Sequence, residues 1–277
     1  LFAHELDDAD QALVAYTQAL CEAPHIGKYA DEIEKLAGTK ADAWQETLGS
    51  ITEAVKNPEI AGADRVALLG VAGRFYEQKL GRADMALMAY QGVLASEPSN
   101  EIAAEAMTAI YRRAQQWPEL HTVLTQRADV AGASPKGRDL RVEAAEILEG
   151  KLNDAGKAKA TYQTVLAEDP GHEKAGEALA RIAEKTGDFE TLVAILERRL
   201  ENVSGAAKAD ALVRVAEAYE DSLNNLNEAT RRFEAALAID PKHPSALKGL
   251  DRIYNRQGKF TELLETLDRQ IAAAATP

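Results

Sequence analysis

The sequence has 277 residues, of which 46% are hydrophobic, 28% charged and only 5% aromatic, and its formal net charge at pH 7 is −13. Abundant alanine with few aromatic residues favours closely packed helices over sheets, and an acidic surface disfavours nucleic acid and anionic membranes as partners. The single cysteine, Cys21, excludes an internal disulfide and a thiolate metal cluster, and no apolar run approaches the ~20 residues that cross a bilayer.

The chain opens with LFAHELDDAD, which contains neither an initiator methionine nor a signal-peptide pattern. Residues 1–6 resemble the remnant of a helix, so we expect a piece of a longer or processed protein. The compartment stays open, with the cytoplasm favoured. Asp7, Asp8 and Asp10 resemble a calcium-loop fragment, but the glycine and the final glutamate of such a loop are missing. We interpret them as acidic residues at the start of a helix, where they favour the helix dipole.

An internal repeat organises the whole chain. Four prolines close helical patterns at separations of 74, 72 and 71 residues: Pro24, Pro98, Pro170 and Pro241. An aromatic residue stands eight positions before each proline: Tyr16, Tyr90, Tyr162 and Phe233. An alanine stands four positions before each aromatic residue: Ala12, Ala86, Ala158 and Ala229. Matches at three linked positions in four copies indicate one array of four units, at about 1–62, 63–137, 138–205 and 206–277.

Each unit divides into two helix–turn–helix repeats, because a second aromatic residue follows a short turn in each: Trp44, Trp117, Phe189 and Phe260. Apolar periodicity predicts helices near 8–22, 28–37, 41–55, 63–79, 82–95, 100–114, 117–130, 138–150, 154–167, 172–185, 188–202, 206–221, 225–238, 243–256 and 259–273. The most turn-rich connector is expected at 132–137. No segment alternates strictly between apolar and polar residues, so no strand is predicted.

The alanine, the aromatic residue four positions on and the closing proline resemble the tetratricopeptide (TPR) repeat pattern. The small residue and tyrosine of the preceding helix also fit, as in Gly73 with Tyr76 and Ala216 with Tyr219. The resemblance spans essentially the whole chain and implies an all-α, right-handed α-solenoid. The first repeat of each pair has one extra residue in its turn (GKLNDAGKA, DSLNNLNEA), and the second has Leu120, Leu192 or Leu263 where the family usually has alanine. Alternating long and short repeats imply a structural period of two repeats.

Enzyme motifs are missing from the sequence. No histidine pairs with another histidine, a cysteine or a carboxylate at a metal-ligand spacing. His172 and His243 follow the repeat prolines by two residues, where we interpret them as solvated turn residues. Phosphate-binding glycine loops and a nucleophile elbow are absent. We therefore expect no catalytic residue, no cofactor, no metal ligand and no enzymatic activity.

The resemblance implies that the first helix of each hairpin lines a concave groove in which peptides or partner helices bind. On this surface the second repeat of each pair carries basic residues: Arg112, Arg113, Arg181, Lys185, Lys248, Arg252 and Arg256. The first repeat of each pair carries mostly acidic residues, with Arg74 as the exception: Glu77, Glu146, Glu149, Glu217, Glu220 and Asp221.

Two interpretations of this charge pattern compete. In one, the arginines and lysines clamp an acidic peptide or a chain terminus. In the other, opposite charges on neighbouring helices form ion pairs. Glu146 and Glu149 would pair with Arg181 and Lys185, and Glu217 and Glu220 would pair with Arg252 and Arg256. Such pairs would be solvated and contribute about 0–1 kcal/mol each. The regular alternation of sign favours pairing.

The expected function is a non-enzymatic scaffold that binds a protein or peptide, possibly an acidic one, on the concave face, without insertion into a membrane. One alternative is a structural segment of a larger protein that self-associates through its terminal hairpins, since neither end has a polar capping helix. The other is an RNA-binding helical array, which the net charge and the lack of repeated base-reading side chains disfavour.

Overall fold

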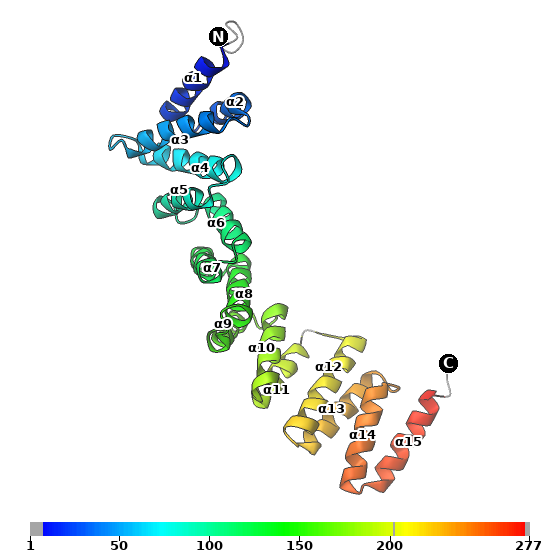
Figure 1. Cartoon of the computed structure of the whole chain (residues 1–277). Helices are drawn as coiled ribbons and strands as arrows, with labels where there is room; N and C mark the ends of the chain where they lie inside the picture. Colours follow the sequence, from blue (N-terminus) through cyan, green and yellow to red (C-terminus); the bar gives the residue numbers. More distant parts are fainter. Residues whose placement is uncertain (1–7, 202, 275–277) are drawn as a thin grey trace. The chain divides into compact units, whose positions relative to one another are not determined.

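A computed structural model describes residues 8–201 and 203–274, and every regular element in these ranges is helical (Figure 1). The chain forms two compact units, unit 1 ending at Leu140 and unit 2 beginning at Arg141. The remnant helix predicted at residues 1–6 lies outside the described residues. None of the described helices is both long enough and apolar enough to cross a membrane.

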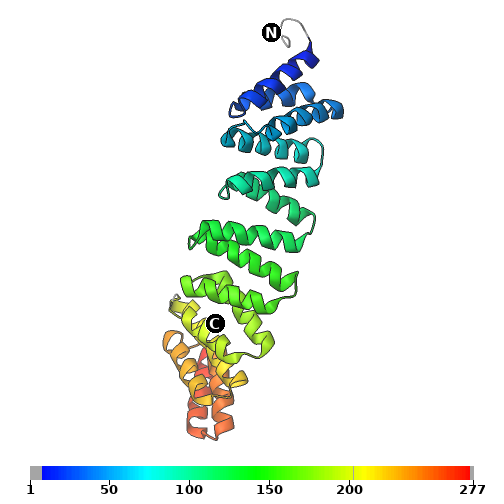
Figure 2. The same ribbon diagram turned by 90° about the vertical axis from the view of Figure 1, so that its left-hand side faces the viewer.

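Unit 1 consists of helices joined by short turns, so that consecutive helices pack side by side as hairpins (Figures 1 and 2). Its helices are α1 (Ala9–Glu22), α2 (Gly27–Ala37), α3 (Ala41–Lys56), α4 (Gly62–Gln78), α5 (Ala83–Ser96), α6 (Glu101–Arg113) and α7 (Trp117–Ala131). Helix α8 (Pro135–Gly150) begins in unit 1 and ends in unit 2. Each hairpin buries one side against the next, as the repeat pattern predicted.

Unit 2 continues the same succession after α8. It contains α9 (Ala155–Glu168), α10 (Glu173–Thr186), α11 (Phe189–Arg199), α12 (Gly205–Glu217), a π-helical turn η1 (Ala218–Ser222), α13 (Leu226–Ile239), α14 (Pro244–Gln257) and α15 (Phe260–Ala274). The predicted helices are confirmed with small shifts at their ends. The π-helical turn was not predicted, and α11 ends earlier than the expected residue 202.

Polar residues at the predicted starts cap the helices. Asn100, Asp154 and Asn225 each accept a hydrogen bond from the backbone N–H three residues on, at 3.1, 3.0 and 3.2 Å. Asp8 does the same for the N–H of Gln11 at 3.0 Å, which confirms its place at a helix start, whereas Asp7 lies outside the described residues. These bonds satisfy donors that a helix leaves open at its first turn.

The connector predicted at 132–137 is shorter than expected. Helix α8 already begins at Pro135, and the Ser134 hydroxyl accepts a hydrogen bond from the backbone N–H of Gly137 at 3.1 Å. Proline suits a first helical position because its missing N–H would have no partner there. The prediction was wrong because it took the proline and Gly137 as turn residues, although both belong to the capped first turn of the helix.

Left-handed residues form the turns at repeating positions. Gly81, Asn153 and Asn224, spaced by 72 and 71 residues, have φ values of 63°, 54° and 48° and occupy the long turns of the first repeats. The short turns of the second repeats place Gln115, Gly187 and Gly258 at φ values of 56°, 71° and 68°. Glycine and asparagine adopt this conformation at low cost. The extra residue of the first repeats is therefore accommodated by a regular turn.

The repeat aromatics fill the core. Tyr90 is 3% exposed, and Tyr162 and Phe233 are fully buried. A methyl group added at Gly73 of α4 would stand 2.6 Å from the Tyr90 ring, and one added at Gly249 of α14 would stand 2.3 Å from the Phe233 ring. The rings of Tyr90 and Phe233 therefore each need a residue without a side chain on the helix facing them. This packing confirms the predicted role of the aromatic residues between neighbouring helices.

Candidate protein-binding surface

The basic residues predicted to bind a partner lie on the first helices of the hairpins. In unit 2 we call the surface formed by α8 from residue 141, α10, α12 with η1, and α14 the first-helix face of that unit. In unit 1 the corresponding surface is formed by α4 and α6. Arg112 and Arg113 end α6 in unit 1. In unit 2, Arg181 and Lys185 lie one turn apart on α10. Lys248, Arg252 and Arg256 lie at one-turn intervals on α14.

Two carboxylate–guanidinium pairs of the same geometry lie on this face in unit 2. Arg181 donates from Nε and Nη2 to the Oε1 and Oε2 atoms of Glu149 at 3.2 and 2.8 Å. Arg252 donates through the same atoms to Glu220, also at 3.2 and 2.8 Å. These bidentate bonds fix the orientation of both guanidinium groups. The hydrogen bonds to Glu149 and Glu220 also raise the pKa values of Arg181 and Arg252, respectively.

In both pairs the acid lies below the base. The side chains of Glu149 and Glu220 are 14% and 2% exposed, whereas those of Arg181 and Arg252 are 51% and 50% exposed. Arg256 also approaches Glu220, with its Nη1 atom 3.8 Å from Oε1. The predicted pairing is confirmed for Glu149 with Arg181 and for Glu220 with Arg252 and Arg256, whereas Glu146 and Glu217 form no ion pair within the described ranges. The expectation that both partners are solvated is wrong for Glu220. Its buried carboxylate depends on the arginines above it.

Unit 1 carries the same kind of pair in a more exposed form. The Arg113 Nη2 atom lies 3.3 Å from Oε1 of Glu77, and the Arg113 side chain is 65% exposed. Arg74, the exception to the predicted alternation, has its Nη2 atom 3.2 Å from Oε1 of Glu34. Lys79 contacts the other oxygen of Glu34. In both units, residues of opposite charge on successive first helices thus form ion pairs.

Not all predicted basic residues take part in these pairs. Lys185 and Lys248 are exposed and form no ion pair within the ranges that the structure describes. The structure therefore pairs Arg181 with the partly buried Glu149 and Arg252 with the buried Glu220, and it leaves a lysine one turn away from each arginine. In unit 2 the face combines paired guanidinium groups with exposed ammonium groups, a set suited to carboxylates.

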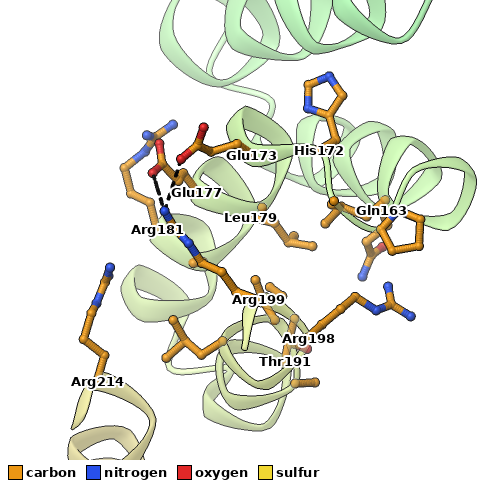
Figure 3. Close-up of a pocket in the computed structure, with 18 of the residues that line it drawn as sticks. Gln163, His172, Glu173, Glu177, Leu179, Arg181, Thr191, Arg198, Arg199 and Arg214 are labelled. Atoms are coloured by element: carbon orange, nitrogen blue, oxygen red, sulfur yellow. Dashed lines mark hydrogen bonds and ion pairs between the residues drawn. The ribbon is translucent and has the colours of Figure 1, made fainter. Parts of the chain in front are cut away.

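A pocket of about 800 Å³ opens beside Arg181 in unit 2 (Figure 3). Leu179 of α10 and Ile195 of α11 contribute to its apolar lining. Three further arginines line it: Arg198, Arg199 and Arg214. Figure 3 places Arg181 and Arg214 on one side of α10 and His172 and Arg198 on the other. The pocket was not predicted from the sequence, although the adjacent arginines at the end of α11 were a usable signal.

The charges around the pocket are partly compensated. The Nη2 atom of Arg199 lies 3.3 Å from Oε1 of Glu173, and its Nη1 atom lies 3.5 Å from Oε1 of Glu177. Arg198 and Arg214 are exposed and have no ion-pair partner among the residues that the structure describes. The pocket therefore offers an apolar floor with cationic groups that a ligand could reach.

The two repeat histidines cap helices. His172 Nδ1 accepts a hydrogen bond from the N–H of Ala175 at 3.3 Å, and His243 Nδ1 accepts one from the N–H of Ala246 at 3.4 Å. His243 is only 9% exposed, and its Nε2 atom lies 2.9 Å from Asp210 Oδ1. The prediction of a solvated turn residue is therefore wrong for His243. Across the described ranges, no group of three or more histidine, cysteine, aspartate or glutamate residues could hold a metal ion.

Comparisons with known proteins agree with this repeat architecture. The family model described as tetratricopeptide repeat matches residues 177–205 and 246–277, which are the corresponding second repeats of the last two units. The chain is 29% identical over 168 residues to anaphase-promoting complex subunit 7 from Arabidopsis thaliana. That match spans 60% of this chain but only 26% of the plant protein.

Solved structures with a similar fold include further repeat proteins. One is the C-terminal part of a TPR repeat-containing protein from Cytophaga hutchinsonii, with a TM-score of 0.44, 14% identity and coverage of 90% of this chain and 97% of that one. Another is YrrB, described as a TPR protein with an unusual peptide-binding site, with a TM-score of 0.40, 16% identity and coverage of 72% and 96%.

Proposed function

Because the chain is a TPR-like helical-repeat protein, we propose that it is a non-enzymatic scaffold that binds a carboxylate-bearing segment of a partner protein on the first-helix face of unit 2. The groups that bind the partner are Arg181, Lys185, Lys248, Arg252 and Arg256. In unit 1, Arg112 and Arg113 form a secondary cationic patch at the end of α6.

The geometry of the two bidentate pairs carries this proposal. Glu149 and Glu220 occupy the Nε and Nη2 atoms of Arg181 and Arg252. The Nη1 atom of each arginine has no hydrogen-bond partner among the described residues, and half of each side chain is exposed. Pairing and partner binding are therefore compatible, because the acid positions the guanidinium while one donor edge stays open.

The surroundings of the pairs define the chemistry of the partner. Lys185, Lys248 and Arg256 add positive charge one turn away from the two fixed arginines, so carboxylates are the favoured ligands. The apolar floor of the pocket beside Arg181 would take a hydrophobic side chain of the same segment. We therefore expect a segment in which acidic residues flank at least one large apolar residue.

The test is a pull-down with three forms of the full chain: wild type, a double variant and a control variant. Each form is immobilised on a resin and incubated with extract from the source organism. The double variant Arg181→Gln with Arg252→Gln removes both open donor edges and should lose the partners that wild type captures. Arg231→Gln is the matched control, because Arg231 is 74% exposed and pairs only locally with Glu228 on α13. It should capture the partners as wild type does. Capture of the same proteins at the same yield by the double variant, with its fold intact by circular dichroism, would contradict the proposal.

A further inference from the structure

The pocket of unit 2 extends to the side of α10 that faces away from Arg181. Residues of the second helices α9 and α11 line this part, and Figure 3 shows Gln163 and Arg198 together on that side. We call the part of the pocket lined by the following five residues the second-helix pocket: Gln163, Leu166, Thr191, Ile195 and Arg198. None of these residues belongs to the first-helix face.

The corresponding repeats show what lies beside the residue equivalent to Gln163. At spacings of 72 and 71 positions, Gln163 corresponds to Gln91 of α5 and to Glu234 of α13. Gln91 donates from Nε2 to the hydroxyl of Tyr111 at 3.5 Å, and Oε1 of Glu234 accepts a hydrogen bond from the hydroxyl of Tyr254 at 3.0 Å. Both tyrosines belong to the following first helix and are 7% exposed. In these two repeats a buried phenol ring therefore reaches a polar residue of the preceding second helix.

Helix α10 lacks this tyrosine. The residue at the corresponding position is Ala183, which is fully buried in a core against which Ile195 also packs. Gln163 is exposed and has no hydrogen-bond partner among the residues that the structure describes. This repeat thus retains the hydrogen-bonding residue of the second helix but not the ring that would meet it.

Neighbouring side chains compensate only in part for the missing ring. Ile195 of α11 stands where the corresponding repeats have the smaller Val123 and Thr266. Val123 and Thr266 are 5% and 4% exposed, whereas Ile195 is only partly buried. At the start of α11, Nζ of Lys159 lies 2.7 Å from Oδ2 of Asp188. Neither partner of this ion pair lines the pocket, so the space between α9 and α11 remains open.

The groups around this space suit a phenol. Leu166, which is 7% exposed, and Ile195 provide apolar walls. The Gln163 amide can donate a hydrogen bond to a hydroxyl or accept one from it. Arg198 is exposed without an ion-pair partner in the described ranges, and a guanidinium group attracts the face of an aromatic ring. Apolar walls with a few polar groups bind a ligand and fix its orientation.

From these observations we infer that the second-helix pocket binds the phenol side chain of a tyrosine from a partner protein. The ring takes the place of the tyrosine that α10 lacks and lies against Leu166 and Ile195. Its hydroxyl forms a hydrogen bond with the Gln163 amide. This inference does not rest on the carboxylate site proposed above, because the two sites share no residue.

The first probe is 4-methylphenol, which carries the ring, the hydroxyl and the first side-chain carbon of tyrosine. Binding to the full chain is followed by NMR through the δ1 methyl group of Ile195, with that of Ile102, 81% exposed on α6, as the internal control. The Ile195 signal should shift saturably and the Ile102 signal should not. Toluene lacks the hydroxyl and should bind at least about threefold more weakly. Gln163→Leu should abolish this difference.

A variant that supplies the ring from the chain itself tests the position of the site. Ala183→Tyr should fold, as judged by circular dichroism, and should weaken binding of 4-methylphenol by at least about tenfold, because its own ring fills the space. The control is Lys174→Tyr, which adds a tyrosine at an exposed position of α10 that does not line the pocket. It should bind the probe as wild type does.

Several results would overturn the inference. Wild type might show no saturable shift at Ile195, or Ala183→Tyr might bind the probe as tightly as wild type. Unfolding of Ala183→Tyr would show that the space does not accept a ring. Equal affinity for toluene and 4-methylphenol would remove the preference for tyrosine. N-acetyltyrosine amide should compete with 4-methylphenol, and failure to compete would exclude a tyrosine side chain as the ligand.

Discussion

The carboxylate of Glu220 is buried beneath the guanidinium of Arg252. Nε and Nη2 of Arg252 donate to its two oxygens at 3.2 and 2.8 Å, while 50% of the Arg252 side chain and only 2% of the Glu220 side chain are exposed. A buried carboxylate is tolerated only when such bonds compensate for its loss of hydration. The pair therefore serves the stability of unit 2 as well as the proposed binding surface.

Removal of this arginine should be more destabilising than removal of its counterpart in unit 1. Arg252→Leu leaves Glu220 with Arg256 at 3.8 Å, and we expect the free energy of unfolding to fall by about 2 kcal/mol. Arg113→Leu should change it by less than about 1 kcal/mol, because Arg113 and Glu77 form a more exposed pair. Urea denaturation of the full-length variants at neutral pH measures the difference. Equal losses for the two variants would show that the burial of Glu220 does not increase the contribution of Arg252 to stability.

The glycine that faces Tyr90 should not tolerate a methyl group. Gly73→Ala places Cβ 2.6 Å from the buried ring, and we expect a loss of roughly 1–3 kcal/mol from overpacking. Gly70→Ala lies on the same helix with no atom within 4 Å of the added methyl and should gain roughly 0.5–1 kcal/mol from helix propensity. Thermal unfolding followed by circular dichroism gives both values. A gain for both variants would mean that the ring moves aside freely.

Gln115 lies in the turn after α6 with a left-handed backbone conformation, and glycine at this position should stabilise the chain. Gln115 has a φ of 56°, where the corresponding repeats have Gly187 and Gly258. Relief of the left-handed strain exceeds the entropic cost of glycine, so Gln115→Gly should raise the free energy of unfolding by roughly 0.5–1 kcal/mol. The reverse change, Gly258→Gln, adds a Cβ atom with no neighbouring atom within 4 Å, so it should lower the free energy of unfolding by a similar amount through backbone strain. A loss of stability in Gln115→Gly would contradict this assignment.

Alkaline pH should weaken unit 1 through Tyr90. Burial, followed by the charge of Glu77, raises the pKa of Tyr90 from 10.0 to about 12. The folded state therefore holds this proton more tightly than the unfolded state, so the contribution to stability is complete below pH 10 and is lost as pH rises towards 12. Tyr90→Phe removes this titration. Between about pH 9 and about pH 11.5, the urea midpoint should fall further for wild type than for the variant. Identical decreases would show that ionisation of Tyr90 does not cause the loss of stability.

Much of the fold could be predicted because its signals are local and repeated. Prolines, apolar periodicity and the aromatic at each fixed position placed the helices, and opposite charges on successive first helices predicted the partners of Arg181 and Arg252. The burial of Glu220 could not be predicted, because it lies in the π-helical turn η1, which has no clear sequence signal. The pocket beside Arg181 depends on the early end of α11 at Arg199 and on the position of Arg214 in the next helix. Such spacing between helices is not encoded by periodicity.

Crosslinking can show whether a partner segment lies on the first-helix face of unit 2. A photo-crosslinking amino acid replaces Lys185, which is exposed one turn from Arg181, and the control carries the same amino acid in place of Arg231 on α13. In extract from the source organism, irradiation should yield a partner adduct from position 185, and high salt should weaken it because the contact is ionic. Adducts of the same partner from position 231, with none from position 185, would show that the partner does not bind on the first-helix face of unit 2.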